Sequence, residues 1–138
     1  MGAADERLYE YAVVRYVPKV DREEFVNIGL IMMCKRLKWL RGEIRLNESR
    51  IRALDPHCKV EGIASQASFF TRGDVPSKEL PVEERYRWLA AVKSAVLQVS
   101  PSHPGLLPEL KNPDPEKSVD AYHELNEEFE RLMKKLVV

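Results

Sequence analysis

The sequence predicts a single α+β domain, in which helices pack on an antiparallel sheet of three to four strands. Three strand-like segments with short connections come first, and segments with helical periodicity follow them, an order typical of α+β domains. The 138 residues correspond to about one domain, because a domain averages about 150 residues. A chain of this length buries about 68–70% of its unfolded surface, so it needs neither a metal nor a disulfide to fold.

The first three strands are predicted to form an antiparallel meander. Residues 8–17 are rich in Tyr and Val, and Pro18 ends this strand because proline cannot donate to a continuing ladder. Residues 26–34 are apolar on both faces, which fits a central strand or one whose outer face meets another subunit. Gly29 within them indicates a bulge or a close backbone approach. Apolar and polar residues then alternate over 39–46, as in a half-buried strand.

Helices are predicted after the meander. Asn47 is a suitable N-cap for a short helix at 48–54. Asp55 and Pro56 then predict a new helix start, with Asp as the cap and Pro in the first turn, and this helix should run to about Phe70.

The last third of the chain alternates helix, strand and loop. A third helix is predicted at 81–91, and a fourth strand at 95–99. Five of the nine prolines lie in 100–117, which predicts a proline-rich loop. Residues 1–7 are expected to form a flexible N-terminus.

The final helix is predicted at 118–136, with Ser118 as its cap. Its apolar side chains recur at helical spacing and form one stripe: Val119, Tyr122, Leu125, Phe129, Leu132, Met133 and Leu136. We expect this stripe to pack across the sheet, with Phe129 the most buried. The alternative is a helix that projects outward to pair with a second subunit.

Composition excludes several classes of function. The 22 basic and 22 acidic side chains cancel, which argues against a nucleic-acid coat or a polybasic membrane binder. The longest apolar run, 28–34, is too short to span a bilayer, and no signal-peptide core precedes it. Cys34 and Cys58 lack metal-finger spacing, so we expect buried thiols in a cytoplasmic protein with no metal and no cofactor.

The strongest local charge lies at 35–52, where the sequence has seven basic residues and only two acidic ones, Glu43 and Glu48. One interpretation is a nucleic-acid interface with an aromatic ring for base stacking. Its residues would be Lys35, Arg36, Lys38, Trp39 and Arg41. The other, which we favour, is a solvated hairpin whose charge protects a sheet edge and is neutralised by the acidic last helix.

A second candidate site surrounds 100–105, where two hydroxyls, an imidazole and a glycine follow a predicted strand. Such groups can bind a phosphate or a carboxylate, or can satisfy the backbone of a turn. If the fourth strand pairs beside the first, a ligand pocket would gather polar residues from several elements. These are Arg15, Asn27, Arg87, Lys93, Ser94, Gln98, Ser100 and His103.

Five stretches match a known pattern in order over nearly the whole chain, the most specific being Arg-Glu-Glu-Phe-Val-Asn-Ile-Gly. They lie at 8–18, 22–29, 51–56, 86–89 and 94–105. Together they resemble a bacterial family catalogued as domain of unknown function 3037, for which no activity is established. The resemblance implies a HipA-like kinase as a partner, because the family's genes often lie beside one. Lys93 stands where the family carries arginine, which weakens a bidentate anion clamp.

Three functional hypotheses follow. We favour a non-enzymatic interaction module that works with a partner encoded nearby, and we assign no catalytic residue. The second hypothesis is a small enzyme or an anion or nucleotide binder that uses 100–105. The third is nucleic-acid binding through 35–52. A homo-oligomer is compatible with all three.

Overall fold

The computed structural model describes residues 8–72, 79–91, 94–107 and 121–138. Within them, five antiparallel strands form one sheet in the order β3-β2-β1-β4, and β5 lies on the same side of β1 as β4. The strands are β1 (Leu8–Tyr16), β2 (Val26–Cys34), β3 (Trp39–Ile44), β4 (Leu97–Val99) and β5 (His103–Leu106). The helices are η1 (Val20–Arg22), α2 (Glu48–Leu54), α3 (Val60–Ala67), α4 (Phe69–Arg72), α5 (Val82–Ala90) and α6 (Ala121–Leu136).

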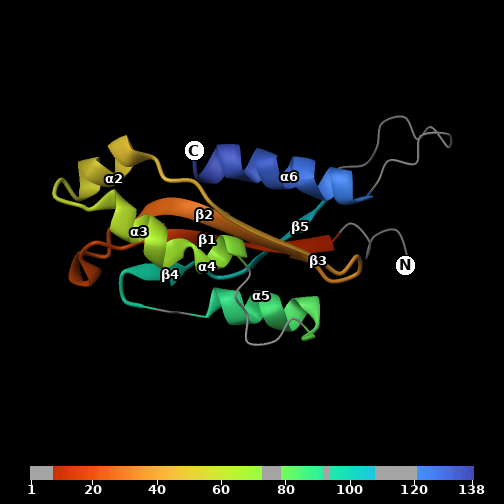
Figure 1. The fold of residues 1–138 in the computed structure, drawn as a ribbon. Helices are drawn as coiled ribbons and strands as arrows, with labels where there is room; N and C mark the ends of the chain where they lie inside the picture. Colours follow the sequence, from red (N-terminus) through yellow and green to blue (C-terminus); the bar gives the residue numbers. More distant parts are fainter. Residues whose placement is uncertain (1–7, 73–78, 92–93, 108–120) are drawn as a thin grey trace.

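The sheet separates two apolar cores (Figure 1). α6 covers one face, and α2, α3, α4 and α5 cover the other. Because β2 is central and buried on both sides, its continuous apolar run is explained as the sequence predicted. The predicted α+β class and the meander of the first three strands are confirmed.

Gly29 marks a change of register in β2. The pairing of β1 with β2 shifts between Val14 and Arg15, where Gly29 and Asn27 are the respective partners. One extra residue, Ile28, is therefore bulged, and the side chains of β2 change faces on passing it. A Cβ at Gly29 would lie 2.7 Å from the carbonyl oxygen of Glu43. Both predicted roles of this glycine, bulge and close approach, are thus confirmed.

The edge beside β1 corrects the predicted loop at 100–117. Its described part contains β5, which pairs with the first half of β1, while β4 pairs with the second half. Ser100 lies between the two short strands. Its N–H bonds the Val13 carbonyl at 2.9 Å, and its Oγ accepts the Val13 N–H at 2.9 Å. Pro104 lies within β5, which is an edge strand and therefore tolerates proline.

The predicted helix from Pro56 to Phe70 is wrong in its start and its continuity. The chain forms two short helices instead, α3 and α4, separated at Ser68. Asp55 does not cap a following helix, because it ends α2 and accepts a hydrogen bond from the Tyr16 hydroxyl at 2.8 Å. By contrast, Asn47 caps α2 as predicted, and its side chain accepts the Arg50 N–H.

α6 packs across the sheet, as its apolar stripe predicts. Phe129 is completely buried, as are Leu125 and Met133 on the same helix. Tyr122 is the exception in the stripe, because nearly half of its surface is exposed. Several sequence predictions lie outside the described residues: the cap Ser118, Val119, the flexible terminus 1–7 and the loop from 108 onward.

Candidate functional site

Three of the eight sequence-predicted ligand residues lie in one row across the sheet. Arg15 of β1 is opposite Asn27 of β2 on one side and Gln98 of β4 on the other. The pairing of β4 with β1, on which the prediction depended, is therefore present. The Arg15 guanidinium stacks on Phe25 at 4.1 Å, and the Asn27 amide donates to the Leu136 carbonyl at 2.9 Å.

The serines of the set bond the backbone. Ser100 holds the junction of β4 and β5, and Ser94 accepts the Leu97 N–H at 2.9 Å. His103 is exposed on β5, and its ring lies 5.4 Å from that of Tyr11. These contacts match the simpler interpretation of 100–105, in which the side chains stabilise a turn and its flanking strands.

Arg87 and Lys93 do not join this row. Arg87 is exposed on α5, the helix on the opposite face of the sheet from α6. Lys93 lies outside the described residues. The set is therefore distributed over both faces of the sheet, and its described members do not converge on one point.

Two arginines of the basic segment are neutralised by α6 and by their own strand. Arg45 bonds Glu130 at 2.7 and 2.8 Å and also contacts Glu43. Arg41 bonds Glu130 at 2.9 Å, Glu43 at 2.7 Å and Asn126 at 3.0 Å. Hydrogen bonding to Arg45 lowers the pKa of the Glu130 carboxyl, opposed in part by its burial. Neutralisation by the acidic helix thus occurs at these two residues.

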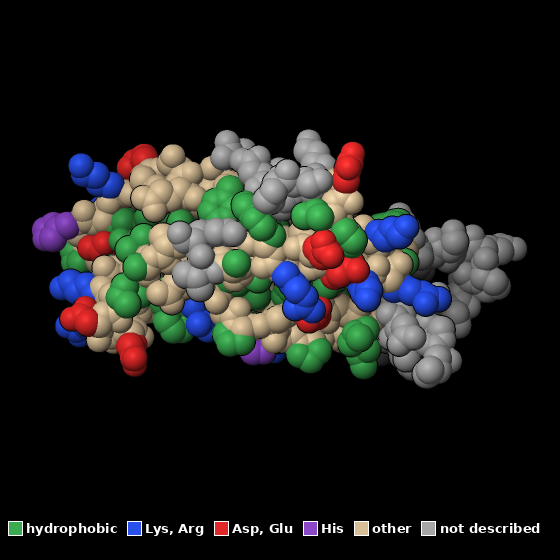
Figure 2. Space-filling model, turned by 90° about the horizontal axis from the view of Figure 1, so that it is seen from below, with side chains coloured by type: hydrophobic (Ala, Val, Ile, Leu, Met, Phe, Trp, Pro, Cys, Tyr) green, Lys and Arg blue, Asp and Glu red, His purple; other side chains and the backbone are tan. Residues whose placement is uncertain are grey.

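The other members of the predicted nucleic-acid set lie at or beside the turn between β2 and β3. Trp39 is half-buried and packs edge-on against Phe129, with ring centroids 6.5 Å apart. Lys35, Arg36 and Lys38 are exposed. Seen from the α5 side, basic and acidic side chains are interspersed among apolar ones (Figure 2).

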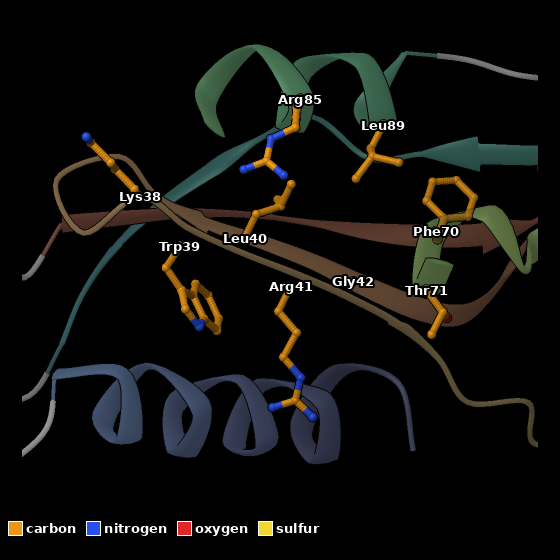
Figure 3. A pocket seen from close by; sticks show the side chains of 9 residues that line it. All are labelled: Lys38, Trp39, Leu40, Arg41, Gly42, Phe70, Thr71, Arg85 and Leu89. Atoms are coloured by element: carbon orange, nitrogen blue, oxygen red, sulfur yellow. The ribbon is translucent and has the colours of Figure 1, made fainter. Parts of the chain in front are cut away.

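A cavity of about 360 Å³ opens beside β3 and includes residues that the sequence did not single out. We call it the β3-edge cavity (Figure 3). Its lining residues come from β3 and its preceding turn, α4 and α5: Lys38, Trp39, Leu40, Arg41, Gly42, Phe70, Thr71, Arg85 and Leu89. A second cavity, of about 460 Å³, shares Lys38 and Arg85 with it.

Arg85 is the charged residue of the β3-edge cavity with a buried, unpartnered polar atom among the described residues. Its Nε is buried and makes no hydrogen bond to any described residue. Figure 3 shows its side chain extending from α5 toward Leu40, whereas Arg41 extends the opposite way, toward α6. The sequence prediction took Arg87 from this helix into the candidate ligand set and left Arg85 out. The available signal was a cation next to the buried face of an amphipathic helix.

A further cavity, of about 430 Å³, contains a group of titratable side chains that includes Tyr16, Asp55, His57 and Cys58. Burial, followed by the hydrogen bond to Asp55, raises the pKa of the Tyr16 hydroxyl. Tyr16 therefore stays a neutral donor to Asp55 and is not an activated base or nucleophile. Cys58 and Cys34 are both buried free thiols.

Among the described residues, no three His, Cys, Asp or Glu side chains are grouped to hold a metal ion. His123 and Glu127 form an exposed pair at 3.0 Å, as their one-turn spacing suggests. None of the helices within the described ranges is long and apolar enough to cross a bilayer.

The fold and the cavity define an α+β protein with a five-stranded antiparallel sheet, one long helix on one face and a partly basic cavity at one edge of the sheet. The chain belongs to the family described as protein of unknown function (DUF3037), whose model matches residues 11–137. The match covers nearly the whole chain, as the resemblance of the five stretches indicated. No curated protein and no solved structure matches the chain.

Proposed function

We propose that this protein is a non-enzymatic interaction module that binds a partner protein along the outer edge of β3. The observation that carries the proposal is an edge strand whose outer side opens on the β3-edge cavity. β3 is the last strand in the sheet order, and its outer edge pairs with no other described strand. A six-residue edge is long enough to accept an added strand from a partner.

The register identifies the backbone groups that would bind the partner. The Arg45 N–H bonds the Ile28 carbonyl of β2 at 2.8 Å, so the backbone N–H of Arg45 points inward to β2. Because hydrogen-bonded and non-bonded pairs alternate in antiparallel sheets, Leu40, Gly42 and Ile44 direct their N–H and C=O groups outward. Partner recognition would use these groups, with specificity from the side chains that line the cavity.

The candidate partner to test first is a HipA-like kinase, which the family resemblance implies. The module would supply a docking edge and the partner would supply the catalysis. This division agrees with the roles of the candidate polar residues in the sheet, because Ser94, Ser100 and Asn27 bond the backbone.

Co-purification with a HipA-like kinase, the partner that the family resemblance implies, tests the proposal. The tagged protein is co-expressed with the kinase and captured at low and at high salt, and we expect the kinase to be retained at low salt at least. Recovery of the protein alone at every salt concentration would overturn the proposal.

Two variants locate the contact. Leu40→Pro removes an outward N–H, whereas Leu40→Ala retains it, so only the proline variant should lose the partner. Thr71→Trp adds a bulky ring at an exposed position of the cavity, and Gln66→Trp adds the same ring to the separate cavity beside Tyr16. The expected result is loss of the kinase with Thr71→Trp alone. Equal retention by both tryptophan variants would place the partner elsewhere and overturn the β3 edge as the docking site.

A further inference from the structure

We propose that the β3-edge cavity is an anion-binding site, in which Arg85 and Lys38 receive a carboxylate from an acidic segment of the partner. This inference rests on the proposed function, and it adds the chemical class of the segment that binds.

The guanidinium of Arg85 is the group that would bind the carboxylate. Arg85 lies on the sheet-facing side of α5, with its Nε buried and without a hydrogen bond to any described residue. A buried donor without a partner carries a desolvation penalty, which a bound acceptor removes. A guanidinium presents its N–H groups as a planar fork, and a carboxylate can accept two parallel bonds from it. The buried Arg15 Nε differs, because its guanidinium is stacked on Phe25 and does not line the β3-edge cavity.

Lys38 is the second cation beside the β3-edge cavity. This residue ends the turn before β3 with a positive φ of 52°, so the turn has an uncommon and well-defined backbone conformation. Lys38 is exposed and lines both the β3-edge cavity and the cavity next to it, as Arg85 does. An ammonium group at the mouth can therefore attract an anion that Arg85 then holds by directed hydrogen bonds.

The other charges near Lys38 and Arg85 favour the β3-edge cavity over its neighbour as the site for a carboxylate. Arg41 also lines the β3-edge cavity, but its guanidinium is engaged by Glu43 and Glu130 on the α6 side. No carboxylate is among the described residues that line this cavity. Glu79 and Glu83 line the adjacent cavity, together with Lys35. A partner carboxylate would therefore be drawn to the β3-edge cavity and not to its neighbour.

The geometry of the β3 edge would direct side chains of an added partner strand toward Arg85. Side chains of a strand alternate between faces, and Leu40 and Ile44 point to the face that α5 covers. A partner residue placed opposite Leu40 or Gly42 would point its side chain to the same face, toward Arg85. An acidic residue at every second position of the added strand would thus combine backbone pairing with a bond to the guanidinium. A free phosphate would use the cations but gain nothing from the edge.

The experiment follows the Arg85 Nε–H resonance by NMR in the ¹⁵N-labelled protein. The probes are a peptide of alternating Glu and Thr, the same peptide with Gln in place of Glu, and inorganic phosphate. We expect the Glu peptide to shift this resonance and the amide signals of Leu40 and Gly42, with affinity that falls as salt is added. Arg85→Gln should weaken binding by about tenfold, as loss of a charge-assisted pair does. The matched control is Arg87→Gln, an exposed arginine on the same helix, which should bind normally.

Three other outcomes of the NMR experiment overturn the inference. Equal shifts with the Gln peptide would show that the site does not recognise a carboxylate. Equal weakening of binding by both arginine variants would indicate general charge attraction. A response to phosphate but not to the Glu peptide would identify a site for a free anion instead of a partner segment. Failure of the proposed function is separate: if the kinase is not captured but the Glu peptide binds at Arg85, only the function fails. If the kinase is captured equally by Arg85→Gln, only this inference fails.

Discussion

Arg41 and Arg85 line the same cavity but have opposite surroundings. Arg41 lies over the Phe129 ring at 4.2 Å and bonds Glu43, Glu130 and Asn126. Arg85 approaches from the other face of the sheet and has a buried Nε without a described partner. Around one edge strand, therefore, one arginine is engaged by α6 and by its own strand, whereas the other has a buried Nε without a described partner.

The α6 side also contains a satisfied buried carboxylate, Glu128, although Asn27 Oδ1 and Glu124 Oε1 on that side are buried without a hydrogen bond to any described residue. Glu128 is buried, accepts the Tyr9 hydroxyl at 3.0 Å and pairs with Arg131. Burial and this bond raise the pKa of Tyr9 to about 12, so the phenol keeps its proton. Arrangements of this kind stabilise a docked helix. The basic character of 35–52 is therefore a poor guide to binding, because two of its cations, Arg41 and Arg45, are already paired with carboxylates.

The largest expected effect tests whether the α6 side is a closed core. Phe129 is completely buried, so Phe129→Ala should lower the free energy of unfolding by about 3–5 kcal/mol. Urea denaturation measures this change, and Leu106→Ala, at a residue that is 61% exposed, should change stability by less than about 0.5 kcal/mol. The melting temperature should not depend on protein concentration. If it does, α6 is an interface between subunits, and the contrast between the two sides is wrong.

The next effect concerns the close approach of α4 to β3. A Cβ at Gly42 would lie 2.3 Å from the Phe70 carbonyl oxygen, so Gly42→Ala must displace α4 or bend the strand. We expect a loss of about 1–3 kcal/mol in thermal or chemical unfolding. Gly62→Ala is the control, because a Cβ there meets nothing within 4 Å in the middle of α3. That variant should gain about 0.5–1 kcal/mol from helix propensity. Equal effects of the two changes would contradict the close approach.

The two arginines themselves provide the direct comparison. Arg41→Gln removes ion pairs and the contact with the Phe129 ring, and should cost about 1–2 kcal/mol. Arg85→Gln removes a donor that has no described partner, so stability should change by less than about 0.5 kcal/mol. Denaturation curves of the two variants, measured beside the parent protein, give both changes in the free energy of unfolding. A larger cost for Arg85→Gln than for Arg41→Gln would mean that Arg85 has a structural role.

The smallest effect is a dependence on pH. Hydrogen bonding to Arg45 lowers the folded-state pKa of Glu130 below its ordinary value of 4.5. The stabilisation is therefore complete above the unfolded pKa and is lost as the pH falls through the folded pKa. Both partners are partly exposed, so the contribution is less than about 1 kcal/mol. Glu130→Gln should reduce the acid-induced loss of stability measured between neutral pH and pH 3. An identical pH profile would show that the pair contributes nothing.

Periodicity predicted much of the fold because it reports burial directly. The apolar run of β2 and the stripe of α6 appear on the predicted faces, whereas β3, predicted to be half-buried, is partly buried on both faces because its second face packs against α6. β5 was missed because its exposed proline-containing sequence has no strand pattern, and only its position beside β1 orders it. The start of α3 was misplaced because the Asp55 side chain accepts the distant Tyr16 hydroxyl in place of a local backbone N–H.

The candidate site was harder to predict than the fold. The sequence indicated that Arg15 and the fourth strand would meet, and Arg15, Asn27 and Gln98 do share a row. It could not show that Ser100 is used by the Val13 backbone, since that bond joins segments far apart in the chain. Nor could it separate Arg85 from Arg87, because their difference depends on which side of α5 faces β3.

The placement of β1 between β2 and the β4–β5 edge determines the order in which the molecule can assemble. The meander of β1, β2 and β3 uses contacts between neighbouring segments, whereas the bond from Val13 to Ser100 joins residues 87 positions apart. Pairing at such separation is slow, because the intervening chain must first lose its freedom. During synthesis, one edge of β1 therefore stays open until β4 and β5 have left the ribosome. An open edge rich in Tyr and Val pairs readily with other chains, so this interval is when the protein is most prone to aggregate and most dependent on chaperones.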